Sequence, residues 1–208
     1  ALISSRICHD LTGPVGAVSN GVELLGEESD LSMREQSLEL LAFSAAETSR
    51  RLQFYRLCFG AAGGPDAVTS LGEAQRAAAG FFEGRKQDLN WPVGHMEALR
   101  IPQSVVQLVL NLILLAGEAL PRGGQIEVEL AADGTGISIQ ASGRNAALRE
   151  DDLAALSGQT KLESLDSRTV QPWFSASVAR EIGAEISVDN SKNEQVFLQA
   201  GPLFKVSD

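Results

Sequence analysis

The chain begins ALISSRICHDLTGPVGAVSNGVELLGEESD (residues 1–30), and the spacing of the apolar residues in this segment indicates the architecture of the amino-terminal part. Apolar residues recur every three or four positions, which predicts one long amphipathic helix: Ile3, Ile7, Leu11, Val15, Val18, Val22 and Leu25. The polar run 27–30 interrupts the pattern. Asp30 or Ser32 can then cap a second helix, and Glu35 follows Ser32 at capping-box spacing.

The second helix is predicted to run to Phe59, with Gly60 as its stop. Its inward positions are Leu38, Leu41, Ala45, Thr48, Leu52 and Tyr55. The two helices form an antiparallel hairpin, and two helices alone cannot bury stripes of this length. The sequence therefore predicts a homodimer in which two hairpins make a four-helix bundle.

A Gly/Pro-rich joint at 61–70 marks a domain boundary, which divides the chain into residues 1–66 and 67–208. Beyond the joint, helical patterns at 71–83, 102–120, 151–157 and 170–182 mix with strand patterns. The strands are expected at 89–93, 126–130, 137–141, 185–188 and 195–198, with a hairpin turn at 133–136. Together they predict an α/β sandwich after the helical hairpin.

Composition excludes several classes of protein. The 208 residues carry a formal charge of −10, so nucleic acid, which needs clustered Lys and Arg, is not an expected partner. Two cysteines, Cys8 and Cys58, cannot make a disulfide scaffold. The longest apolar run, 108–116, is about half of the roughly 20 residues that a membrane span requires. No signal peptide opens the chain, and a cytoplasmic location is expected.

His9 and Asp10 are the first candidates for chemistry. His9 lies almost opposite the apolar stripe of its helix, and Gly13, Gly16 and Asn20 follow it on that exposed face. Glycine inside a helix costs about 1 kcal/mol relative to alanine, so two on one face suggest that another molecule approaches the backbone closely. The alternative is a solvated surface histidine beside glycines of no consequence.

The segment His9-Asp10-Leu11 followed by Pro14 resembles the phospho-acceptor box of sensor histidine kinases, in which a dimeric helical bundle carries the histidine and an α/β domain binds ATP. The helix with Asn111 resembles the kinase N-box, but Leu115 replaces the second asparagine, and leucine cannot bind Mg²⁺. Ala141 occupies the position at which the kinases have an aspartate that binds the adenine amino group. Residues 169–174, Thr-Val-Gln-Pro-Trp-Phe, replace the glycine-rich phosphate loop.

An intact phospho-acceptor box beside a degenerate ATPase-like domain resembles the ChpT-type histidine phosphotransferases of alphaproteobacteria. Residues 53–63, QFYRLCFGAAG, and Gln171-Pro172-Trp173 extend that resemblance. The resemblance implies a dimeric, cell-cycle relay between the receiver domain of a hybrid kinase and downstream response regulators.

In that relay His9 would carry the phosphoryl group, and Asp10 would hold its imidazole or act as a base. Arg6, Thr12, Gly13, Gly16 and Asn20 would contact the receiver domain. This chain would bind no cofactor or metal, because the receiver domain would bring Mg²⁺ in its acidic pocket. Two alternatives stay open: a divergent histidine kinase, and a non-catalytic dimeric scaffold or inhibitor of two-component proteins.

Overall fold

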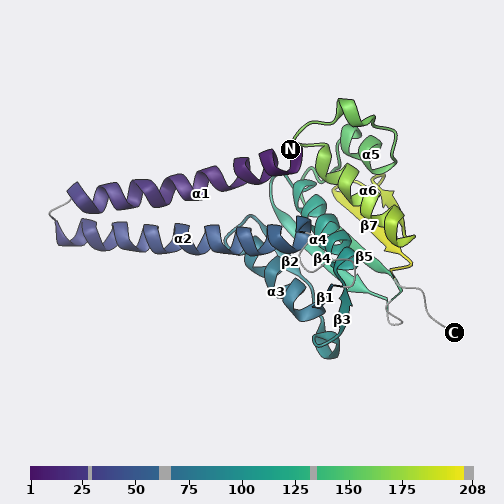
Figure 1. The fold of residues 1–208 in the computed structure, drawn as a ribbon, viewed down its shortest axis with the longest axis horizontal. Helices are drawn as coiled ribbons and strands as arrows, with labels where there is room; N and C mark the ends of the chain where they lie inside the picture. Colours follow the sequence, from purple (N-terminus) through teal and green to yellow (C-terminus); the bar gives the residue numbers. More distant parts are fainter. Residues whose placement is uncertain (28–29, 61–66, 132–134, 204–208) are drawn as a thin grey trace.

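A helical hairpin projects from an α/β body in the computed structural model, which describes residues 1–27, 30–60, 67–131 and 135–203 (Figure 1). Helix α1 (Leu2–Glu27) and helix α2 (Leu31–Phe59) form the predicted antiparallel hairpin. Asp30 caps α2, since its carboxylate accepts hydrogen bonds from the backbone N–H groups of Ser32 and Met33. Of the two predicted caps, the structure therefore selects Asp30.

Close contact between the two helices depends on Gly21. A Cβ atom at that position would lie 3.3 Å from Cβ of Leu41, tighter than ordinary packing. The hairpin is nevertheless only partly covered in one chain. Apolar side chains remain exposed along both helices: Val15, Val22, Leu24, Leu31, Met33, Leu38, Leu40, Phe43 and Leu52.

The body contains a mixed five-stranded sheet in the order β2-β4-β5-β7-β6. Its strands are β2 (Gln87–Asn90), β4 (Gly124–Leu130), β5 (Ile137–Ser142), β6 (Glu185–Asp189) and β7 (Gln195–Gly201). Strand β2 runs parallel to β4, and the other neighbours are antiparallel. A small second sheet pairs β1 (Val68–Ser70) with β3 (Arg100–Pro102).

Helices cover one face of the large sheet, as an α/β sandwich requires (Figure 1). Helices α3 (Leu71–Phe82), α4 (Gln103–Glu118) and α6 (Val170–Ile182) contact the strands, and α5 (Glu150–Leu156) packs against α6. Helix α4 lies at the centre, and twelve of its sixteen residues are buried. Two short 3₁₀ helices occupy 94–96 and 162–164.

The hairpin and the body share one core. Near the end of α2, the side chains of Phe54, Tyr55, Leu57 and Cys58 are buried with the apolar residues of α3 and α4. The hairpin is therefore anchored where α2 ends, while the end of α1 and the start of α2 lie away from the body (Figure 1).

The structure corrects several predicted boundaries. Strand β2 covers 87–90 instead of 89–93, because Pro92 lacks the N–H group that a ladder needs. Strands β1 and β3 were not predicted, since three residues are too few to show a pattern. Residues 61–66 of the joint and 133–134 of the hairpin turn lie outside the described residues. Within the described ranges, no helix combines the length and apolarity needed to cross a bilayer.

Candidate functional site

Helix α1 presents His9 to solvent near its first turns, with 88% of the side chain exposed. The exposure follows from the helical period, because His9 lies nearly opposite the apolar stripe of α1. Thr12, Gly13 and Asn20 are exposed on the same helix, and Gly16 is half-buried. A Cβ atom added at Gly13 or Gly16 would meet no atom within 4 Å, so these glycines are not required by packing within the chain.

Asp10 links His9 to helix α2. Its Oδ1 lies 3.2 Å from Nδ1 of His9, while its Oδ2 accepts a hydrogen bond of 2.5 Å from the hydroxyl of Tyr55. An imidazole whose Nδ1 carries the shared proton keeps the lone pair on Nε2. Among the described residues no hydrogen bond occupies Nε2, so the geometry leaves this nitrogen open to solvent.

The backbone of Asp10 is held as well. Pro14 lacks the N–H group that would donate to the carbonyl of Asp10 within the helix. The guanidinium of Arg51 on α2 donates to this carbonyl instead, and it also pairs with Glu47 one turn earlier. Arg51 of α2 therefore supplies the hydrogen bond that Pro14 of α1 cannot donate.

A cleft of about 460 Å³ opens beside His9 between α1 and the body. The body contributes Glu118, Arg149, Ser167 and Arg168 to its walls. The Arg149 guanidinium forms a bidentate pair with Asp152, which raises the pKa of this arginine. Arg168 is exposed at the rim. A partner that reaches His9 would thus meet basic side chains of the second domain.

Arg6 differs from its predicted surface position. Its side chain is 9% exposed, its guanidinium pairs with Glu118, and Nη1 donates to the backbone carbonyl of Arg168. The reason is tertiary: the body packs against this side of α1, which the pattern of one helix cannot show. In this structure Arg6 is a bridge between the hairpin and the second domain.

Comparisons with known proteins agree with this arrangement. The family model of the histidine phosphotransferase C-terminal domain matches residues 71–194. Protein phosphotransferase ChpT of Brucella abortus (strain 2308) is 37% identical over 201 residues, which are 95% of this chain and 92% of the relative. A solved bacterial phosphotransferase superposes with a TM-score of 0.81 at 35% identity, covering 96% of this chain and 94% of the other. The chain belongs to the histidine phosphotransferase family.

In this phosphotransferase family member, the residues that resemble the kinase nucleotide site serve the core. Leu115 and Ala141 are completely buried. Asn111 is buried too, and its amide donates to the backbone carbonyls of Cys58 and Gln107. Its Oδ1 accepts a hydrogen bond from Gln171 at 3.0 Å. All the hydrogen-bonding groups of the Asn111 side chain are therefore engaged inside the protein.

The segment 169–174, predicted to replace a phosphate loop, begins helix α6. Helix α6 starts at Val170, and Gln171 and Pro172 are buried in its first turn. Gln171 ties α6 to α4, because its Nε2 also donates to the backbone carbonyl of Asn111 and lies 3.3 Å from Oγ of Ser175. The segment thus forms a packed helix start.

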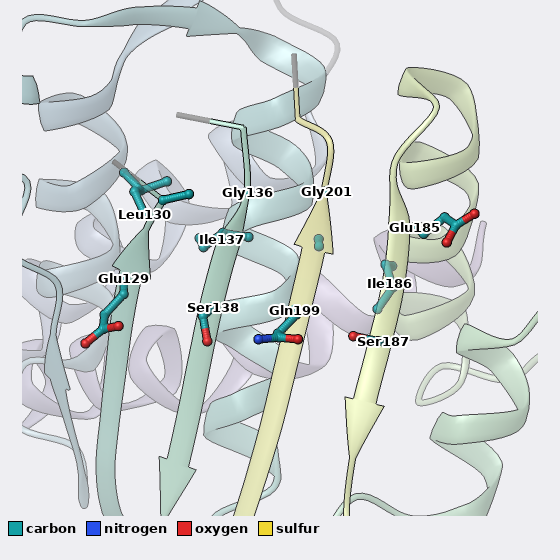
Figure 2. Close-up of a pocket in the computed structure, with 12 residues that line it drawn as sticks. Glu129, Leu130, Gly136, Ile137, Ser138, Glu185, Ile186, Ser187, Gln199 and Gly201 are labelled. Atoms are coloured by element: carbon teal, nitrogen blue, oxygen red, sulfur yellow. The ribbon is translucent and has the colours of Figure 1, made fainter. Parts of the chain in front are cut away.

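A second hollow lies on the open face of the sheet and differs in chemistry. Figure 2 shows side chains from four neighbouring strands around it, among them Glu129, Ser138, Gln199, Ser187 and Glu185. Its volume is about 500 Å³, and its lining includes no histidine, cysteine or basic residue. Phosphoryl transfer through histidine therefore has no candidate group there. In the described part of the chain, no three His, Cys, Asp or Glu side chains gather as metal ligands.

The structure brings His9 and Asp10 together, and it places Thr12, Gly13, Gly16 and Asn20 along the adjoining helix. Sequence reasoning missed Tyr55, Arg51, Arg149 and Arg168. Tyr55 was counted in the apolar stripe of the second helix, and its hydroxyl was the available signal, because a buried tyrosine hydroxyl needs a partner. The partner itself depends on the register of the hairpin.

Proposed function

We propose that this chain relays a phosphoryl group between the aspartates of two receiver domains, with His9 as the carrier. The observation that carries the proposal is the exposed imidazole of His9 at the cleft, whose Nδ1 lies beside Asp10 while Nε2 has no hydrogen-bond partner among the described residues. The name of the Brucella relative, a protein phosphotransferase, supports the same class of reaction.

The transfer follows from these atoms. The lone pair on Nε2 of His9 attacks the phosphorus of an aspartyl phosphate on the first receiver domain. The bond between phosphorus and the aspartyl oxygen breaks, and its electron pair leaves with the receiver carboxylate. The proton on Nδ1 stays in the hydrogen bond to Asp10, whose negative charge stabilises the positive charge that develops on the ring. In the second half, a receiver aspartate attacks the phosphohistidine and the imidazole leaves.

Positioning supplies much of the catalysis in phosphoryl transfer, together with Mg²⁺. We infer that the receiver domain contributes this ion, because both carboxylates that this chain presents at the cleft are already engaged: Asp10 by Tyr55 and His9, and Glu118 by Arg6. The chain's own part is then to hold the imidazole and to seat the receiver. One receiver belongs to a hybrid kinase and the other to a response regulator.

The receiver would dock on the small-residue face of α1 that includes Thr12, Gly13, Gly16 and Asn20. The glycines let another backbone approach, since no atom of this chain uses the space above them. The basic rim of the second domain, represented by Arg168, lies at the same cleft and suits the acidic surface around a receiver's phosphorylation site. We therefore assign secondary receiver contacts to this domain.

The hairpin would complete its packing against a second copy of this chain. Its exposed apolar side chains lie along both helices, and isolated hairpins of this length leave such stripes unburied. A four-helix bundle made by two copies buries them in a symmetric interface.

A divergent kinase is the competing enzyme class, and the contacts of the α4–α6 region argue against it. Asn111 is committed to Cys58, Gln107 and Gln171, and Leu115 offers no oxygen to Mg²⁺. We infer that the chain does not use ATP. A non-catalytic scaffold or inhibitor is the other competitor, and it predicts that His9 is dispensable.

The test is the transfer of labelled phosphate from a phosphorylated receiver domain to the wild-type protein and to His9→Ala. We expect acid-labile, base-stable label on the wild type and none on the variant, because the variant lacks the attacking nitrogen. His95, the second histidine of the chain, stays in place in both proteins and serves as the internal control.

Both proteins should elute with twice the mass of one 22.1 kDa chain, which shows that the bundle is intact in each. Receiver binding without label on either protein would favour the scaffold or inhibitor. Label from ATP alone would favour the kinase.

A further inference from the structure

Tyr55 of α2 meets Asp10 of α1 across the hairpin, although 45 residues separate them in the chain. Its side chain is buried, and its ring is packed among three other aromatic rings. The ring centroids lie 5.8 Å from Phe54, 5.6 Å from Phe81 and 5.9 Å from Phe59. Packing on this scale fixes where the hydroxyl points.

The hydroxyl is a permanent donor. Burial is the first cause that raises the pKa of Tyr55 well above its ordinary value, and the hydrogen bond to Asp10 and the charge of that carboxylate raise it further. Arg85 and Arg6 act in the opposite direction and do not outweigh these effects. Oδ2 of Asp10 is therefore occupied by a donor, and Oδ1 remains for His9.

Sequence neighbours on a helix point in different directions, so the contact between His9 and Asp10 does not follow from α1 alone. Something must turn the Asp10 carboxylate toward the imidazole. Tyr55 does so at the side chain, and Arg51 holds the backbone carbonyl of Asp10 that Pro14 leaves without a helical donor. Both restraints come from α2.

We propose that Tyr55 is a positioning residue for phosphoryl transfer, acting through Asp10 to hold the imidazole of His9 with its proton on Nδ1 and Nε2 turned outward. The inference rests on the proposed function, in which His9 carries the phosphoryl group. A free exposed imidazole would divide its time between two tautomers and several rotamers. Because Asp10 restrains the imidazole in one tautomer and one orientation, less conformational freedom is lost when the phosphoryl group is transferred.

The test is Tyr55→Phe, which keeps the ring and its aromatic contacts and removes the hydroxyl alone. We expect the maximal rate of phosphoryl uptake to fall about tenfold, the loss of one hydrogen bond to a charged group. The receiver concentration that gives half the maximal rate should not change, because Tyr55 is buried and does not meet the receiver.

A spectroscopic readout separates positioning from packing. Long-range ¹H–¹⁵N spectra report the tautomer of each imidazole, and the chain has two histidines. In the wild type His9 should be mainly the Nδ1–H form, and in Tyr55→Phe the two tautomers should mix. His95, which lies in a 3₁₀ turn, should give the same signal in both proteins.

Two further variants complete the design. In an Asp10→Ala background, Tyr55→Phe should cause little further loss, because the pathway to His9 is already broken. Ser177→Ala removes a different hydroxyl, one that donates to the backbone of its own helix α6, and should leave the rate unchanged.

If Tyr55→Phe keeps the wild-type rate and tautomer ratio, the positioning role of Tyr55 is overturned. Label on His9 would still support the relay in that case. Absence of label on the wild-type protein would overturn the relay itself, so the two failures are distinguishable. A lowered rate with an unchanged tautomer ratio would assign Tyr55 to packing and would also overturn the inference.

Discussion

The region around His9 and the region around Asn111 use polar side chains in opposite ways. At His9 the hydrogen bonds engage Asp10 and one ring nitrogen, and among the described residues the other nitrogen has no partner and stays open at the surface. At Asn111 every polar group of the side chain is buried and paired with Cys58, Gln107 or Gln171. A polar group supports chemistry with a partner only where the fold leaves part of it unsatisfied.

The contrast also shows how the two parts of one fold use their polar groups. In the hairpin, α2 holds Asp10 beside His9, and the histidine itself stays exposed. The helices α4 and α6 need no open polar group, so Leu115 and Gln171 are free to serve the core. Asn111 of α4 also joins α2 to the body, because its amide donates to the carbonyl of Cys58 near the end of α2.

The largest effect is expected for Asn111→Leu, which tests whether the polar groups at α4 are structural. The substitution leaves the Cys58 carbonyl without its side-chain donor and removes one acceptor from Gln171, both in a buried setting. Each buried group left unpaired costs about 1–3 kcal/mol, so the free energy of unfolding should fall by about 2–4 kcal/mol. Chemical denaturation at one fixed protein concentration measures this loss.

The matched control is the double variant Asn111→Leu with Gln171→Leu. Among the described residues, the buried Oε1 of Gln171 meets no hydrogen-bond partner. Removing the Gln171 amide beside the leucine introduced on α4 therefore replaces a broken polar pair by an apolar one. Part of the lost stability should return. A single variant as stable as the wild type would break the comparison, since the polar groups at α4 would then contribute nothing.

A smaller effect is expected at the proposed docking face of α1 and the cleft. Substitutions there should leave the stability of the protein intact and weaken its binding to the receiver domain. Gly16→Leu and Arg168→Glu should each weaken receiver affinity by about tenfold, because one fills the approach space and the other reverses a rim charge. Gly16→Leu should at the same time raise helix stability, since glycine is the poorer helix former.

Titration of a fluorescent receiver domain measures both affinities, and the charge reversal should lose its effect at high salt. Lys192→Glu is the control for charge, because Lys192 lies over the ring of Phe197 on the sheet and outside the cleft. If Gly16→Leu binds the receiver as tightly as the wild type, the small-residue face is not the docking surface.

Most of the architecture could be predicted from local pattern. The period of α1 placed His9 outward, and the cap of α2 was narrowed to Asp30 or Ser32. The α6 boundaries at 170–182 and the antiparallel pairing of β4 with β5 follow from local helix and strand patterns. These features depend on neighbours within a few residues. Repeating apolar spacing over two long helices was enough to predict the hairpin itself.

The missed features are those set by distant contacts. Arg6 was predicted on the surface, because the packing of the body against α1 is invisible in the pattern of α1 alone. The partnership of Tyr55 with Asp10 depends on the register between two helices, and Arg51 enters through the same register. Local spacing cannot give such pairings, and they are the contacts that hold Asp10 beside His9.

The smallest effect on stability is expected in the turn before α6. There, close to the cleft, the carboxylate of Asp166 is engaged by hydrogen bonds, as the side chain of Asn111 is, and we expect it to be structural. Asp166 accepts hydrogen bonds from the backbone N–H groups of Thr169 and Arg168 and from the Thr169 hydroxyl, and these bonds lower its pKa. A carboxylate with a lowered folded-state pKa stabilises the protein above its unfolded pKa of about 3.9, and this contribution is lost as the pH falls through the folded value.

Asp166→Asn should therefore be less stable than the wild type near pH 7 by less than about 1 kcal/mol, because solvent screens the charge of this exposed carboxylate and the asparagine oxygen still accepts hydrogen bonds. The gap should begin to close as the pH falls below about 4, where the unfolded carboxyl takes up a proton, and should close fully only below the lowered pKa of the folded protein. Denaturation curves of both proteins between pH 7 and pH 3 measure this convergence, and because the two differ at one residue, the other carboxylates cancel. A gap that stays constant with pH would mean that the charge of Asp166 does not support the turn.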